Sequence, residues 1–343
     1  MNDSNCKLCI HEPSSSIGSH IFPAYIIKTA FDEEGRNRDH EIMYSISSIE
    51  FQDKFFGRSV LPDKVTEELG RELSEEEMKK RNFFVRSNLL CKKCEAKLKV
   101  VEDYFCLNIH EKFKENDVNH YAGKELDGDY NNLLIRLFIY SLFWRASVTK
   151  INGFELKPEF EEKLRLLLID IIEEKTETTL LKAEERNERI KDLPLSIFRG
   201  PIVDKSSSNL VYLPLDHVQP YITMVNDYIF FLFEKKSEII QDFYHVNYYD
   251  FLNYKESDVF KIASLSIKDW EKLKGVIIQL GVDKMLKNIV ELYREMYKRK
   301  FTFYPSEPKV KRFLNFLVID NDNKIGDLYS KENIVKAMNE SLR

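Results

Sequence analysis

The chain has 343 residues, of which 43% are hydrophobic and 32% are charged, and its formal net charge is −5. This length suffices for about two domains with cores of their own, so the composition excludes both a single small module and a disordered chain. The negative charge also excludes a protein that coats nucleic acid by bulk electrostatics, because neutralising phosphates requires an excess of Lys and Arg.

The first 113 residues predict short elements around two cysteine pairs. The apolar stretch 21–27 predicts a strand, and the polar segment 31–81 is interpreted as an irregular insertion with one short helix at 74–80, where Ser74 and Glu77 form a capping box. After the second pair, apolar residues recur at helical spacing from Leu98 to Ile109 and predict a helix over 95–113.

Beyond a polar, glycine-containing linker at 115–129, the pattern becomes more apolar. A run at 133–148 predicts a buried helix, and 160–181 predicts a longer amphipathic one. Short β-type runs predict a small antiparallel sheet. The strands are expected at 195–198, 210–215 and 228–233. Helices are expected at 238–252, 267–280 and 283–297, and a last apolar run follows at 313–319.

No apolar run reaches the roughly 20 residues that cross a bilayer, since Arg136 interrupts the longest one. The first nine residues lack the basic start and apolar stretch of a secretory signal. We therefore expect a cytoplasmic protein with no membrane partner. In that reducing compartment, cysteines are better explained as metal ligands than as disulfides.

Four of the five cysteines, Cys6, Cys9, Cys91 and Cys94, form two Cys-x-x-Cys pairs. Each pair can present two thiolates from a tight turn, and four sulfurs satisfy the tetrahedral preference of zinc. The pattern predicts one structural Zn²⁺. Two alternatives stay open: unrelated reduced pairs, because the 81 intervening residues exceed the usual finger spacing, and a redox pair.

The sequence around the cysteines carries a specific resemblance. The segment Ser19-His20-Ile21-Phe22-Pro23 follows the first pair, and Asn88-Leu89-Leu90 leads into Cys91-Lys92-Lys93-Cys94-Glu95. This order resembles the zinc-containing branch of the HNH endonuclease superfamily, the ββα-metal fold. It is more similar still to bacterial HNH-like proteins with a Ser-His-Ile-x-Pro signature, whose Leu-x-Trp-Arg-Ala-Ser helix is matched at 142–147. The likeness covers residues 1–170, with the nuclease-like part in the first 115.

The resemblance implies a metal-dependent endonuclease that hydrolyses DNA phosphodiesters, in phage defence or in a mobile element. His20 matches the base that activates water, Asn88 matches the asparagine that orients this base, and Glu95 stands at a position that binds the catalytic Mg²⁺ or Mn²⁺. At the other cation position, where the superfamily has Asp or His, this chain has Ser19, whose neutral hydroxyl is a weaker ligand.

Structural interpretations of the same residues stay open. His20 can be a histidine that bonds a backbone carbonyl, and Glu95 can be a first-turn acid favoured by the helix dipole. The alternative function is a catalytically inactive zinc-fold adaptor that binds a protein partner. A weaker hypothesis is a DNA-binding regulator that holds phosphates with Lys92 and Lys93. Arg145, on the predicted buried helix, is expected to pair with an acid such as Glu161 or Glu162, and its alternative is to face a ligand or phosphate. His110 is expected to be exposed.

DNA contacts would use local basic patches. One lies beside the second cysteine pair and one near the C-terminus, and their members are Lys79, Lys80, Arg81, Arg86, Lys298, Arg299, Lys300, Lys309, Lys311 and Arg312. Such clusters are also typical of a solvated face. The predicted fold is α+β, with a zinc-stapled HNH-like domain at 1–120 and a mostly helical domain with a small antiparallel sheet at 121–343.

Overall fold

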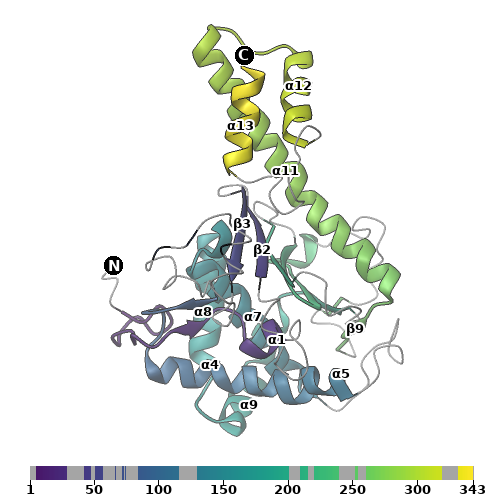
Figure 1. The fold of residues 1–343 in the computed structure, drawn as a ribbon. Coiled ribbons are helices and arrows are strands. Elements are labelled where there is room, and N and C mark those ends of the chain that lie inside the picture. Colours follow the sequence, from purple (N-terminus) through teal and green to yellow (C-terminus); the bar gives the residue numbers. More distant parts are fainter. Residues whose placement is uncertain are drawn as a thin grey trace.

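The computed structural model describes residues 5–28, 42–47, 51–56, 84–115, 130–200, 209–214, 220–238, 252–253, 260–318 and 331–342, together with positions 66, 72 and 74. The chain has an α+β fold in which helices predominate, as the sequence predicts (Figure 1). A body of helices and sheets carries a helical head at one end (Figure 1). Within the described residues, no helix is both long and apolar enough to cross a membrane.

The N-terminal elements form a small sheet and a long helix. Their bounds are β1 (Ser19–His20), α1 (Ala24–Lys28), β4 (Val85–Arg86), α4 (Lys92–Phe105), the π-helical turn η2 (Cys106–His110) and α5 (Glu111–Glu115). Strands β1 and β4 are antiparallel, with Ser19 opposite Arg86. The strand predicted over 21–27 is wrong. Pro23, whose fixed φ suits a helix start, instead precedes α1, and its carbonyl accepts from Ile26 N and Ile27 N.

The centre of the body is α7 (Asn132–Val148), which is buried on nearly all sides as its apolar sequence predicts. Asn131 caps it, because its Oδ1 accepts from Leu133 N at 3.0 Å and from Leu134 N at 3.2 Å. Around it lie η3 (Ile151–Gly153), α8 (Pro158–Ile171), α9 (Thr176–Glu185) and α10 (Asn187–Lys191). The single helix predicted over 160–181 is therefore two helices, because the backbone turns extended at Ile172.

The main sheet has seven strands in the order β3-β2-β6-β7-β8-β5-β9. Their bounds are β2 (Ile42–Ser47), β3 (Phe51–Phe56), β5 (Leu195–Arg199), β6 (Asn209–Tyr212), β7 (Tyr221–Val225), β8 (Tyr228–Leu232) and β9 (Ala263–Ser264), and the 3-10 turn η4 (Lys236–Glu238) follows β8. The pairs β2–β6 and β5–β9 are parallel, and the others are antiparallel. The prediction that 31–81 is irregular is wrong for the hairpin β2–β3, which extends the sheet.

One apolar core joins the N-terminal elements to the body. Phe105 of α4 stacks on Phe138 of α7 with ring centroids 4.2 Å apart, and it meets the ring of Phe230 of β8 at 6.3 Å. Both segments flanking the predicted boundary at residue 120 contribute to this core. The linker at 115–129 and the helices predicted at 74–80 and 238–252 fall largely outside the described residues, and the division into two domains stays a prediction.

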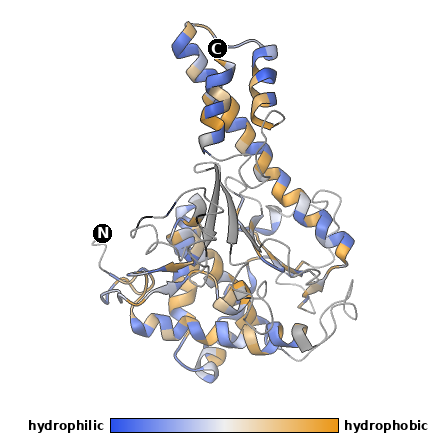
Figure 2. Cartoon of the chain, viewed as in Figure 1, coloured by the Kyte–Doolittle hydropathy of each residue, from blue (hydrophilic) through white to orange (hydrophobic). Residues whose placement is uncertain are grey.

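The C-terminal head consists of the end of α11 (Ile267–Phe301) with α12 (Glu307–Val318) and α13 (Lys331–Ser341). It has its own core, in which Tyr293 of α11 stacks on Phe313 of α12 at 4.4 Å. Figure 2 shows hydrophobic and hydrophilic residues alternating along α11, which is typical of an amphipathic helix. The two helices predicted at 267–280 and 283–297 are therefore one helix, because the chain stays helical through Gly281.

Gly281 allows α11 to lie against the main sheet. A Cβ at this position would overlap the hydroxyl of Tyr212 in β6, whereas a Cβ at Gly275 on the same helix would meet nothing within 4 Å. We expect Gly281→Ala to lower the free energy of unfolding by about 1–3 kcal/mol through overpacking. Gly275→Ala, the matched control, should raise it by about 0.5–1 kcal/mol through helix propensity. Urea unfolding measures both, and equal effects would contradict the contact.

Candidate metal centre

The first cysteine pair lies in a tight loop closed by backbone hydrogen bonds. Ile10 N donates to Cys6 O at 2.9 Å, and Cys6 N donates to Glu12 O at 2.8 Å. Ile10 has a positive φ of 61°, and its carbonyl accepts from Asn5 Nδ2 at 3.2 Å. A left-handed conformation is uncommon for a branched residue, so the loop is held in a shape that its local sequence does not favour.

The second pair lies where the turn after β4 becomes α4. Cys91 is the N-cap residue, and its Sγ accepts from Cys94 N at 3.4 Å. The turn before it contains Asn88 with a φ of 60°, a conformation that Asn tolerates better than most residues. Leu89 and Leu90 are buried in the core. The helix start thus points two sulfur atoms toward the first loop.

Three backbone hydrogen bonds join the two loops. Lys7 N donates to Leu89 O at 2.9 Å, and Ser15 N donates to Leu90 O at 2.8 Å. In return, Asn88 N donates to Ser15 O at 3.0 Å. These bonds place two segments side by side that are about 80 positions apart in the sequence.

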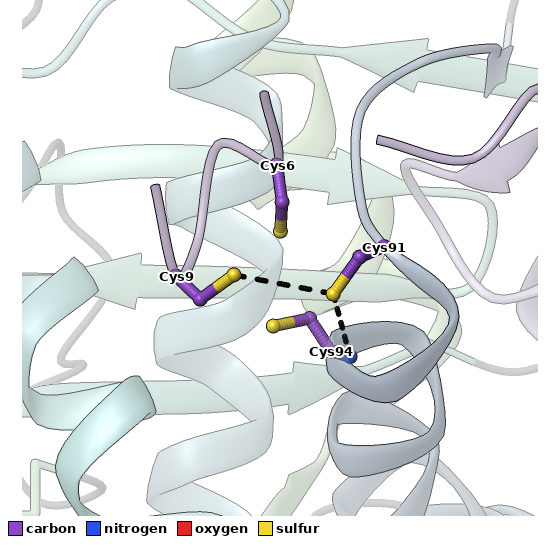
Figure 3. Close-up of side chains that lie close together, drawn as sticks. All are labelled: Cys6, Cys9, Cys91 and Cys94. Atoms are coloured by element: carbon purple, nitrogen blue, oxygen red, sulfur yellow. Dashed lines mark hydrogen bonds between the residues drawn. The ribbon is translucent and has the colours of Figure 1, made fainter. Parts of the chain in front are cut away.

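The four cysteine sulfur atoms converge, as Figure 3 shows. All lie within 4.8 Å of one another, and Cys9 Sγ is 3.9 Å from Cys91 Sγ. A tetrahedron with zinc–sulfur bonds of about 2.3 Å has sulfur–sulfur edges of about 3.8 Å, close to this spacing. All four cysteines are reduced. The donor set can therefore hold a metal ion such as zinc, with the ligands that the sequence predicts.

The electrostatics of the cluster also suit a cation. A hydrogen bond with the Cys94 thiol lowers the pKa of Cys6 to about 4, and the same contact together with burial raises the pKa of Cys94. Burial also raises the pKa of Cys91. A bound divalent ion would supply the positive charge that allows four thiolates to lie this close together.

Helix α8 supports the first loop from outside the cluster. Arg165 Nη1 donates to Leu8 O at 2.6 Å, and Nε and Nη2 of the same guanidinium bind both oxygens of Glu162 at 2.7 Å. This two-point pair orients Arg165 toward the loop. The position of the first cysteine pair therefore depends on the body as well as on the second pair.

The two cation positions of the resemblance lie against each other. Ser19 Oγ on β1 donates to Glu95 Oε2 in the first turn of α4 at 2.7 Å. Ser19 is 3% exposed, Glu95 is half-buried, and His20 is exposed. Successive residues of a strand point to opposite sides, which explains this alternation. In the described part of the chain, the four cysteines are the only group of three or more His, Cys, Asp or Glu residues whose ligand atoms converge.

The backbone of His20 is held by a buried arginine. Arg145 Nη1 on α7 donates to His20 O at 2.9 Å and forms an ion pair with Glu102 of α4. The prediction that Glu161 or Glu162 pairs with Arg145 is wrong in its partner. Glu161 instead accepts from the hydroxyl of Ser147, which lies two residues after Arg145 and on the other side of the helix. Burial raises the pKa of Glu102, and Arg145 opposes that shift.

Asn88, predicted to orient His20, is exposed in the turn after β4 and contributes its backbone N–H to the loop junction. Lys92 and Lys93 are exposed in the first turn of α4. Arg86 is exposed as well. Its neighbours in the predicted basic patch, Lys79, Lys80 and Arg81, lie outside the described residues.

A buried histidine contradicts the expectation of exposure at this position. His110 is 0% exposed, and its Nδ1 lies 3.1 Å from the hydroxyl of Tyr228. Its ring is 5.0 Å from that of Tyr25. The reason is the π-helical turn η2, whose extra residue per turn rotates the following positions toward the core. A period of 3.6 residues, as read from the sequence, does not reveal this shift.

No family model matches the chain, and neither a curated protein nor a solved structure matches it.

The converging sulfurs lead to a test of the metal. Cys91→Ser should reduce bound zinc from about one ion per chain to a small fraction and should lower the unfolding temperature, because this residue is both ligand and helix cap. Cys106→Ser is the matched control, since Cys106 lies outside the cluster, and it should retain the metal. Elemental analysis and thermal unfolding measure both effects. Full zinc content in a folded Cys91→Ser variant would contradict the assignment.

The buried ion pair leads to a second test. Arg145→Met should lower the free energy of unfolding by about 3–5 kcal/mol, because Glu102 would be left buried without its cation. The pKa of Glu102 would rise further above its unfolded value, so the variant should regain stability as the pH falls from 7 toward 5. Adding Glu102→Gln should recover part of the loss. Urea titrations at both pH values measure this, and a pH-independent loss would contradict it.

Proposed function

We propose that the chain is a metal-dependent endonuclease of the HNH type that hydrolyses DNA phosphodiesters, with a structural zinc ion on Cys6, Cys9, Cys91 and Cys94. The observation that carries the proposal is the arrangement of β1, β4 and α4. Two antiparallel strands precede a helix, with His20 on the first strand and Glu95 on the first turn of the helix. This order of elements is the one expected of a ββα-metal fold.

Each residue has a defined part in this proposal. His20 is exposed, so its imidazole can take a proton from a water molecule that attacks phosphorus. Glu95 would hold a catalytic Mg²⁺ or Mn²⁺ through a carboxylate oxygen, and such a cation would neutralise the charge that develops on the phosphate. Ser19 holds this carboxylate through its hydroxyl at 2.7 Å. Arg145 holds the backbone of His20 in position by donating a hydrogen bond to the carbonyl oxygen of His20.

The proposed base is tested by substitution. His20→Ala should lower the rate of DNA cleavage in Mn²⁺ or Mg²⁺ by on the order of 10²- to 10⁴-fold. Zinc content should stay unchanged, because His20 is not one of the four ligands and alanine retains the backbone carbonyl that accepts from Arg145. His11→Ala is the matched control, since His11 is exposed on the first cysteine loop. Equal cleavage by wild type and His20→Ala would remove His20 from the mechanism.

Ser19→Asp supplies a further readout for the cation within the same experiment. The new carboxylate would lie next to Glu95 in a buried position, where two negative charges repel each other unless a cation separates them. We expect this variant to unfold at a lower temperature in the absence of added divalent ions and to recover in Mn²⁺. Glu95→Gln should raise the concentration of Mn²⁺ needed for cleavage. Variants insensitive to Mn²⁺ in both assays would argue against a cation at this place.

The second candidate is a zinc-fold adaptor, the alternative left open by the sequence. One observation favours it: the hydroxyl of Ser19 already donates to Glu95 Oε2, an oxygen that a catalytic cation would need as a ligand. If wild type and Ser19→Asp are both inert on DNA and RNA with every divalent cation tested, the adaptor becomes the better description.

A further inference from the structure

The free end of the head is strongly basic. Between Lys298 and Arg312 the chain has six basic residues and one acidic residue, a local charge of +5 in a protein whose overall charge is −5. Lys298, Arg299 and Lys300 form the last turn of α11, and Lys309, Lys311 and Arg312 belong to the beginning of α12. Lys309 is half-buried, and the other five are exposed.

These cations lie close together because the two helices meet at a short turn. Only 302–306 separates α11 from α12. At 1.5 Å per residue, Arg312 lies about 8 Å along α12 from Glu307. Figure 1 places the turn at the end of the head that is farthest from the body, and Figure 2 shows hydrophilic residues at the end of α11 and over the first turns of α12. We call residues 298–312 the basic tip.

Two exposed aromatic side chains lie within the basic tip. Phe303 is 60% exposed and Tyr304 is 52% exposed. The ring of Tyr304 is held by Lys298, whose Nζ lies 4.4 Å from the ring centroid and donates to the hydroxyl at 3.0 Å. The ring of Phe303 lies 5.8 Å from that of Tyr297. Large rings exposed beside cations form platforms on which nucleobases stack.

The acidic groups near the basic tip are already engaged. Glu307 accepts from Arg294 Nη2 at 2.9 Å, and Glu295 accepts from the hydroxyl of Tyr304 at 3.1 Å. Lys300 donates to Leu342 O at 3.3 Å, which joins the tip to the end of α13. The single acidic residue of the tip is thus paired with an arginine from outside it, and the net charge of residues 298–312 is positive.

We propose that the basic tip binds single-stranded DNA, with phosphates on its cations and bases stacked on Phe303 and Tyr304. Phosphate contacts explain the local charge, and the exposed rings favour a single strand, because bases in a duplex are stacked on one another and offer no free face. The inference rests on the proposed function for the choice of DNA as the nucleic acid. It adds a second DNA contact, on the basic tip, that is separate from the proposed catalytic site at His20.

Binding is measured on the full-length protein with a fluorescent single-stranded oligothymidylate and no added divalent cation. The charge variant is Arg299→Gln with Lys311→Gln, and it should weaken binding on the order of tenfold and reduce the salt slope, log Kd against log salt, by about 1.4. The matched control is Lys268→Gln with Lys287→Gln, which removes two exposed lysines from α11 outside the tip. The control should bind as the wild type does.

The rings are tested separately. Phe303→Ala should weaken binding by roughly 5- to 150-fold, whereas Phe303→Tyr, which retains a stacking face, should restore it. Circular dichroism confirms that each variant keeps the helices. Three results would overturn the proposal: no binding by the wild type, equal competition by polyglutamate or anionic lipid vesicles, or tighter binding to a duplex of the same length.

The test is separable from that of the nuclease. His20→Ala, which removes the proposed base, should bind the oligonucleotide as the wild type does, whereas the charge variant and Phe303→Ala should bind it more weakly. Binding without cleavage would therefore support the basic tip while contradicting the proposed function. Cleavage with unchanged binding in both tip variants would do the reverse.

Discussion

The junction between the first cysteine loop and the start of α4 is the contact on which the N-terminal architecture depends. Strands β1 and β4 have two residues each, too few to form a stable sheet alone. Their pairing follows from the neighbouring junction, where three backbone hydrogen bonds and four converging sulfurs join the loops. A metal ion bound by the four sulfurs would further stabilise the alignment of the two loops that the backbone hydrogen bonds establish.

The junction also determines what surrounds His20. Once β1 lies beside α4, Ser19 reaches Glu95, and the next carbonyl of the strand reaches Arg145 on α7. Consecutive residues of β1 are thus fixed to two different helices, one through a side chain and one through the backbone. The ion pair between Arg145 and Glu102 joins these helices in turn. The candidate site is therefore a product of the body core, and the zinc loops alone would not assemble it.

The sequence was most informative where spacing and chemistry agree. Four thiols in two short turns predict their own convergence, and the apolar run of α7 predicts a buried helix. Long-range partners were less predictable. Nothing local to Arg145 distinguishes Glu102 from Glu161, because both are acids that become neighbours only after folding. The same holds for Tyr212, whose hydroxyl lies against Gly281 in the middle of α11, where two helices were expected.

Other errors arose from backbone geometry. Pro23 converted an apolar stretch from the expected strand into the start of α1, although its φ also suits a loop. The π-helical turn moved His110 into the core, and the hairpin β2–β3 was hidden in a polar segment because its pairing strand, β6, is far away in the sequence. Each error reflects a contact or a torsion that a period of 2 or 3.6 residues does not encode.

Helix α11 has a consequence for how insertions and deletions act on this protein. Its residues Trp270, Leu273 and Ile277 pack on the sheet, and Met285 to Tyr297 pack in the head. The two cores are therefore connected by one continuous helix. Inserting a single residue between Ile277 and Met285 would turn the head by about 100° about the helix axis and lift it by about 1.5 Å, whereas seven residues would nearly restore its facing. The orientation of the head relative to the sheet thus depends on the number of helical residues between Ile277 and Met285, a segment whose side chains are only partly buried.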